Sequence, residues 1–317
     1  MIRFCRLLML IQSTLMATPT QAEEFNSTQK VNQTLVNFSK VNRPRVCDPS
    51  VSESNLEKCQ EKMRRLYQDN TAHIDLFLGY LDSGGEPPVT ADAVQRAYLV
   101  QKLYTTCGTE PCGFKADAKN ADKLSKTLAD GKRIQVNLHS SALTDRDDLN
   151  RKNPDQAVRT SKLNEKFKHA LKNNEAVFYI GHSRDGGGPD FGPPRLLKNG
   201  HTDYDWYRKN RPGLKMIKEN MRKSHPELYG SFSCDSLHHF AAPIRSVNPD
   251  VIYFGTKRLA YYNFTQKVVN NVVLPDRLLY SEVVDSALLA VGGIATRKCD
   301  FNKTFLQNKM PTEADYN

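Results

Sequence analysis

Three short apolar and aromatic runs constrain the fold of this chain more than any other feature. They span residues 176–180, 228–232 and 251–255, and polar residues or turn formers follow each of them closely. Runs of this length and composition are typical of strands that are buried on both faces, as in a parallel sheet. The sequence therefore predicts a central sheet whose strands run mostly parallel.

Amphipathic helical patterns alternate with these strands. Leu163, Phe167 and Leu171 lie on one side of a helix that leads directly into the first run. Further strands are expected at 74–81 and 134–138, and further helices at 52–70, 91–104, 123–130, 214–223, 237–242 and 278–291. This alternation predicts an α/β fold with a doubly wound, mostly parallel sheet and helices on both faces.

The N-terminus has the pattern of a secretory signal peptide over residues 1–22. A short basic segment precedes the apolar residues 7–16, and Thr20-Gln21-Ala22 offers small residues for cleavage. We expect an exported protein, secreted or periplasmic after cleavage, with a polar leader and an N-terminal helix over 23–70 and the α/β domain over 71–317. No later segment has the length and apolar character of a membrane span.

The charge of the chain gives only a weak indication of its partners. The formal net charge is +10, and it falls to about +8 once Arg3 and Arg6 are removed with the signal peptide. Because the basic residues are scattered and not interleaved with aromatic residues, we expect no nucleic-acid partner.

Export would permit disulfide bonds. After loss of Cys5, the pairs Cys47 with Cys59 and Cys107 with Cys112 are close enough in sequence to close local loops, although spacing alone does not fix connectivity. Cys234 and Cys299 remain. They form a third disulfide or leave Cys234 as a reactive thiol.

Two of the predicted strands end near residues that can perform acyl transfer. His182 follows the run 176–180, and Cys234 follows the run 228–232. Parallel strands present such residues at one edge of the sheet, where an imidazole can deprotonate a thiol. Cys234 also lies at an expected helix start, where the helix dipole stabilises a thiolate.

The glycine-rich segment 181–190 follows the first of these strands. Its backbone can turn sharply and offer amide donors to an oxyanion, with Ser183, Gly186 and Gly187 as the candidate residues. A serine-hydrolase turn is excluded because Asp185 stands where Gly-x-Ser-x-Gly requires glycine. His182 and Asp185 leave a metal-dependent hydrolase as an alternative, but the chain lacks a His-Glu-x-x-His spacing, and we expect no metal or other cofactor.

These two blocks resemble the catalytic blocks of the caspase-like cysteine peptidases, which include caspases, legumains and gingipains. Residues 178–183, Phe-Tyr-Ile-Gly-His-Ser, are similar to the block that carries the histidine, and residues 231–236, Ser-Phe-Ser-Cys-Asp-Ser, to the block that carries the cysteine. The resemblance covers roughly residues 74–295 and implies a caspase-like fold. It implies that His182 is the general acid/base, that Cys234 is the nucleophile, and that the amides of Ser183 and Cys234 hold the oxyanion. Ser183 and Ser233 depart from the family pattern, which has glycine and a small residue, usually alanine, at these positions.

The expected function is therefore that of an exported cysteine endopeptidase acting on a peptide or protein substrate. Asp185 would favour basic substrate side chains, whereas Arg258 would favour acidic ones. The alternative is an inactive caspase-like protein, a disulfide-stabilised secreted binding or envelope protein in which Cys234 pairs with Cys299. The sequence predicts no particular oligomeric state.

Overall fold

The computed structural model describes residues 56–80, 96, 99–100, 103, 113–144, 146–256, 287–288 and 290–295. The predicted signal peptide, residues 23–55 of the leader, most of the expected helix 278–291, and Arg258 lie outside these residues. So do Cys47, Cys107, Cys112, Cys299 and the side chain of Cys59. The predicted local disulfides therefore remain predictions.

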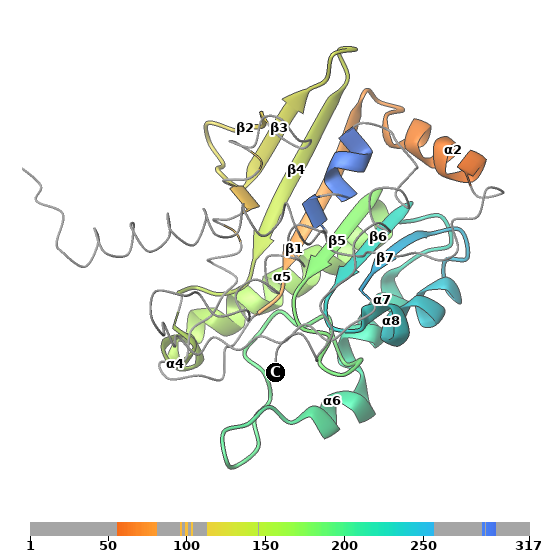
Figure 1. The fold of residues 1–317 in the computed structure, drawn as a ribbon. Coiled ribbons are helices and arrows are strands. Elements are labelled where there is room, and N and C mark those ends of the chain that lie inside the picture. The colour runs from red at the N-terminus through yellow and green to blue at the C-terminus, as the bar shows by residue number, and fades with distance from the viewer. Residues whose placement is uncertain are drawn as a thin grey trace, which may run out of the picture.

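Within the described residues, seven strands form one mixed sheet with the order β2-β3-β4-β1-β5-β6-β7 (Figure 1). Strands β4, β1, β5, β6 and β7 are parallel, whereas β2 and β3 join one edge in antiparallel orientation. The strands are β1 (Thr71–Leu78), β2 (Lys115–Ala116), β3 (Lys123–Thr127), β4 (Arg133–Ser140), β5 (Ala176–Ile180), β6 (Leu228–Phe232) and β7 (Ile252–Gly255). The predicted α/β fold with a mostly parallel sheet is confirmed.

Helical segments cover both faces of this sheet. The helices whose bounds lie within the described residues are α2 (Leu56–Leu66), α4 (Asp147–Lys152), α5 (Pro154–Asn173), α6 (Tyr204–Asn210), α7 (Pro212–Asn220) and α8 (Ser236–Arg245). On one face α5, α7 and α8 supply Phe167, Ile217 and Phe240 to a core cluster. On the other face α2 and the helical residues 291–295 contribute to a second cluster.

The alternation of side chains along β5 explains why its sequence is apolar throughout. Phe178 and Ile180 of β5 belong to the cluster beneath α2, whereas Val177 and Tyr179 belong to the cluster beneath α5. All five residues of β5 are buried. Since complete burial of one large apolar side chain contributes about 1.5–3 kcal/mol, each face strongly selects apolar residues.

The expected helix over 123–130 is wrong, because β3 (Lys123–Thr127) occupies most of that segment. β3 pairs with β4 through a turn at Gly131, whose φ of +82° suits glycine. Leu124 is the only side chain of β3 that is fully buried. Pairing with a neighbouring strand therefore decides the conformation of a segment whose own hydrophobic pattern is weak.

Helix α2 is packed on the domain and held by charge as well as by apolar contacts. Met63 and Leu66 are buried in the core. The Lys62 ammonium lies 2.6 Å from a carboxylate oxygen of Glu227, the residue before β6, and the Arg65 guanidinium lies 3.3 Å from the other oxygen. These contacts join the N-terminal helix to the start of a central strand.

No helix in the described part of the chain has the length and apolar character needed to cross a membrane.

Candidate functional site

His182 and Cys234 occupy equivalent positions beyond two adjacent parallel strands. Ile180 of β5 is paired with Phe232 of β6, and each candidate lies two residues further along its strand. The pairing continues past the strand ends, because the Gly181 N–H donates a hydrogen bond of 3.1 Å to the Phe232 carbonyl oxygen. The topology therefore brings the two residues to the carboxyl ends of two neighbouring strands, at the same end of the sheet.

Cys234 carries a thiol and is not part of a disulfide in the structure, and it is partly exposed. It lies just before the start of α8, where the partial positive charge of a helix N-terminus favours an anion. Asp235 adopts a left-handed conformation with φ of +46°, which produces the sharp change of direction between β6 and α8. The local backbone thus places the sulfur at a strand-to-helix junction.

Hydrogen bonds of Ser236 and Thr256 hold this junction in place. Its hydroxyl donates a hydrogen bond of 2.5 Å to the Ser231 carbonyl oxygen and accepts one of 2.9 Å from the Thr256 N–H. The Tyr253 hydroxyl donates to the Ser236 carbonyl oxygen at 2.9 Å, and the Thr256 hydroxyl donates to the Ser233 carbonyl oxygen. The backbone around Cys234 is therefore tied to β6 and to the end of β7.

His182 opens the glycine-rich loop, residues 182–190, and is 8% exposed. The loop turns tightly, because the Gly188 N–H donates to the Ser183 carbonyl oxygen at 2.7 Å and the Gly187 N–H donates to the Arg184 carbonyl oxygen at 3.0 Å. The Gly187 amide is therefore engaged within the turn in this conformation. Within the described part of the chain, the Ser183 amide donates to no backbone carbonyl.

Asp185 and Gly186 connect this loop to α8 and α6. The Arg208 Nε of α6 donates to the Asp185 carboxylate at 2.6 Å, so the candidate specificity residue already has a basic partner. The His239 Nε2 of α8 lies 3.8 Å from the other Asp185 oxygen. A Cβ atom at Gly186 would lie 3.1 Å from Nδ1 of His239, which shows how closely the imidazole approaches the loop.

Burial lowers the pKa of His239, and this is the largest effect on that group. Asp235 and Asp185 act in the opposite direction, whereas His238 and Arg211 add to the lowering. A second imidazole that favours its neutral form therefore lies against the loop that begins with His182.

A buried ion pair fills the position between the ends of β1 and β5. The Arg184 Nε donates to Asp190 at 3.0 Å, and its guanidinium lies 5.8 Å from the centre of the Tyr207 ring. The Tyr207 hydroxyl also donates to Asp190, at 3.2 Å, while the Tyr80 N–H, just past β1, donates to the Asp190 carbonyl oxygen at 3.0 Å. The strand order reverses between β1 and β5, because β2, β3 and β4 lie on one side of β1 and the later strands lie on the other. Doubly wound sheets commonly bind ligands at such a point, beyond the carboxyl ends of the strands. Here the protein's own polar side chains occupy that position.

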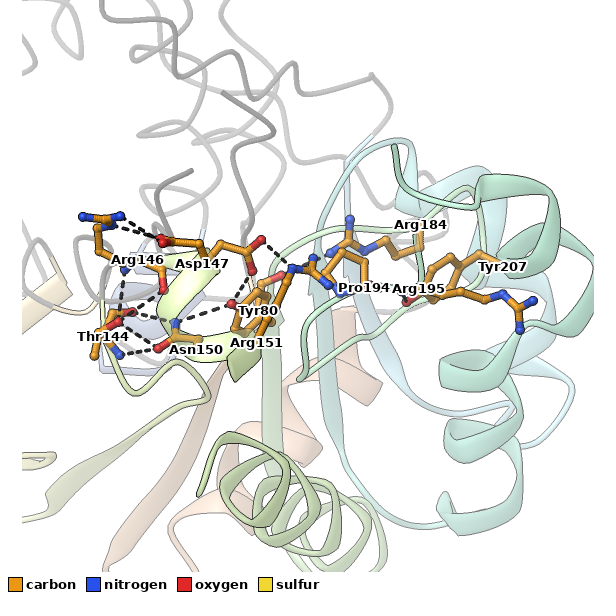
Figure 2. Close-up of polar contacts among 11 residues, drawn as sticks. Tyr80, Thr144, Arg146, Asp147, Asn150, Arg151, Arg184, Pro194, Arg195 and Tyr207 are labelled. Atoms are coloured by element: carbon orange, nitrogen blue, oxygen red, sulfur yellow. Dashed lines mark hydrogen bonds and ion pairs between the residues drawn. The ribbon is translucent and has the colours of Figure 1, made fainter. Parts of the chain in front are cut away.

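A second polar cluster extends this network toward α4, as Figure 2 shows. The Tyr80 hydroxyl donates to Asp147 at 2.5 Å, and the Arg151 Nε donates to the other Asp147 oxygen at 2.7 Å. Arg151 also donates to the Pro194 carbonyl oxygen at 3.0 Å. Burial, followed by the hydrogen bond to Asp147, raises the pKa of Tyr80 above its usual range, so this phenol stays protonated. These hydrogen bonds link Tyr80, just past β1, to α4 and to the segment around Pro194.

The sequence identified His182, Cys234 and the loop between 181 and 190, but it did not predict the contacts through which four further residues organise the site. They are Tyr179, Arg184, Tyr207 and His239. The glycine pattern around Arg184 and the pair His238-His239 after Cys234 were the available signals. Among the described residues, no cluster of His, Cys, Asp and Glu side chains could hold a metal ion.

Comparisons of the chain with protein-family models, curated protein sequences and solved structures give no match.

Proposed function

We propose that this chain is a caspase-like cysteine endopeptidase in which Cys234 is the nucleophile and His182 is the general acid/base. The observation that carries the proposal is the equivalent placement of the two residues beyond the paired strands β5 and β6. A thiol and an imidazole at one sheet edge form the smallest unit that can carry out nucleophilic acyl transfer.

The chemistry follows from these two groups. His182 accepts the proton of the Cys234 thiol, and the thiolate attacks the carbonyl carbon of the scissile peptide bond. The resulting oxyanion is held by backbone amides, with Ser183 as the first candidate donor and Cys234 as the second. The C–N bond then breaks, His182 returns the proton to the leaving amine, and water hydrolyses the acyl-thioester to release the acid and restore the thiol.

Two further features support the proposal. The start of α8 favours a thiolate at Cys234. The turn of the glycine-rich loop is held by its own hydrogen bonds, so a donor there is positioned before substrate binds. The signal-like pattern of residues 1–22 supports export of the protein, and the proposed substrate is a peptide or protein.

Hydrolysis of a peptide library by the purified chain tests the proposal. Cys234→Ala and His182→Ala should each abolish turnover, while Cys234→Ala keeps the thermal midpoint within a few degrees. Lys223→Ala, an exposed substitution outside the site, serves as the control and should retain activity. Unchanged turnover in either active-site variant would overturn the proposed roles.

The second candidate is an inactive caspase-like protein that binds a ligand in an exported or envelope setting. It is favoured by the burial of His182 and by the polar side chains that fill the position between β1 and β5. In that case the wild-type chain would show no library hydrolysis, and Cys234→Ala would unfold if the sulfur is structural.

A further inference from the structure

We infer that Tyr179 is a positioning residue for the proposed dyad, because its hydroxyl holds together both ends of the loop that begins with His182. The inference rests on the proposed function and extends it to a residue that does not touch substrate. It depends on three relationships around the Tyr179 side chain, namely its burial, its contacts with glycine backbone, and the hydrogen bonds of its hydroxyl with His182 and Asp190.

The Tyr179 ring is fully buried and lies against backbone that only glycine allows. A Cβ atom at Gly79, just past β1, would lie 2.4 Å from the Tyr179 hydroxyl oxygen. A Cβ atom at Gly181 would lie 2.3 Å from the same oxygen. Both distances are far shorter than ordinary contacts, so the two glycines leave the space in which the phenol can cross from β5 to the end of β1.

The Tyr179 hydroxyl contacts the first and the last residue of loop 182–190. It donates a hydrogen bond of 3.0 Å to the His182 carbonyl oxygen. It accepts a hydrogen bond of 3.2 Å from the Asp190 N–H. One oxygen atom therefore closes the loop at its base, where a change in the backbone would move both the imidazole and the Ser183 amide.

This clamp acts on the peptide unit that joins the two proposed catalytic groups of the loop. The His182 carbonyl belongs to the same planar peptide as the Ser183 N–H, so fixing the oxygen also fixes the direction of that donor. Productive geometry in such sites is sensitive to displacements of about 1 Å. Loss of the hydroxyl should therefore disturb catalytic geometry while leaving the ring and its packing in place.

Neighbouring strand β6 offers a matched control. Tyr229 is paired with Val177 across β5 and β6, and it is as fully buried as Tyr179. Within the described part of the chain its hydroxyl has no hydrogen-bond partner. Tyr179→Phe and Tyr229→Phe thus remove the same atom from neighbouring buried positions, but only the first removes a contact with the loop.

The test uses the full chain and three readouts. Amide hydrogen exchange reports opening of the segment 182–190, alkylation by iodoacetamide reports the reactivity of Cys234 across pH 6–8, and steady-state hydrolysis separates kcat from KM. Tyr179→Phe should speed exchange in the loop and lower kcat about tenfold with KM nearly unchanged, an effect on the scale of the hydrogen bonds that the hydroxyl makes. Its alkylation profile should shift toward that of His182→Ala, whereas Tyr229→Phe should match the wild type in all three.

Two results would overturn the inference, and they are distinguishable. If His182→Ala alters alkylation and turnover but Tyr179→Phe behaves as Tyr229→Phe does, the clamp is not a positioning device and the proposed dyad stands. If the wild type and His182→Ala alkylate at the same rate, the dyad itself fails and the role of Tyr179 fails with it.

Discussion

Arg184 and Asp190 form an ion pair across the base of the glycine-rich loop, with 3.0 Å between Nε and Oδ2, and the Arg184 side chain is only 1% exposed. Arg184 itself has a left-handed backbone with φ of +48°. Its guanidinium also approaches the Tyr80 carbonyl oxygen at 3.5 Å, so the pair joins the loop to the end of β1. The stability of the fold depends on both members of such a buried pair, because removal of one leaves the other charge buried and uncompensated.

We therefore predict that Asp190→Asn destabilises the fold by about 3 kcal/mol, the scale for breaking a buried pair. Asp203→Asn is the matched control, because it weakens an ion pair to Arg195, whose side chain is more than half exposed, and keeps the side-chain oxygen that caps α6. The control should change stability by about 0–1 kcal/mol. Urea unfolding of both variants measures the difference, and equal midpoints would contradict the structural role of the Arg184–Asp190 pair.

Glu175, which precedes β5, should make the stability of the chain depend on pH. Burial, with Asp69 and Glu227 nearby, raises the pKa of Glu175 to about 7 from 4.5. Its Oε2 atom is buried and has no hydrogen-bond partner within the described part of the chain. Because the folded state binds this proton more tightly than the unfolded state, the contribution is present below pH 4.5 and is lost as pH rises through 7.

Glu175→Gln should consequently be more stable than the wild type at pH 8 and close to it at pH 4.5. The exposed Glu219→Gln on α7 is the control and should follow the wild type at both values. Denaturant midpoints at the two pH values measure the effect. A Glu175→Gln difference of the same size at both would show that the carboxyl is not protonated preferentially in the folded state.

His239 should have the opposite pH dependence. Burial lowers the pKa of His239 in the folded state. Its contribution to stability is therefore full above about pH 6.5, the usual pKa of histidine, and is lost as pH falls below about 6.5 through the lowered folded-state pKa. His239→Gln should therefore reduce the loss of stability between pH 7.5 and pH 5. His238→Gln, on the same helix with its side chain largely exposed, should change that loss much less, because burial and not His238 is the main cause of the lowered His239 pKa. Thermal midpoints of the wild type and both variants, measured between pH 7.5 and pH 5, test this difference.

Much of the fold could be predicted because strong local patterns coincide with the final structure. The strand ending at Ile180 is apolar at every position, the strand ending at Phe232 is buried throughout and mostly apolar, and the helix carrying Leu163 and Phe167 has a clear periodicity. The strand at Lys123 was not predicted, because its conformation depends on pairing with β4 and only Leu124 is buried there. The short helix α6 was also missed, within a segment where prolines and glycines dominate the local signal.

The candidate site could be predicted only in part, for a related reason. His182 and Cys234 stand out because each follows a buried strand, and sequence position alone reveals that. Tyr179 does not stand out, because in the sequence it is one more aromatic residue of a buried strand, and its role depends on backbone contributed by Gly79 and Asp190. Contacts between segments distant in the chain determine such roles.

The rate of Cys234 alkylation in the wild type and in His182→Ala, mapped to the cysteine by peptide mass spectrometry, tests the central claim most directly. An adjacent imidazole should make Cys234 of the wild type react at least about tenfold faster than that of His182→Ala near pH 6.5, where an ordinary thiol is mostly protonated. Equal rates, or a wild-type Cys234 that is inert because its sulfur is already bonded to another cysteine, would contradict the account.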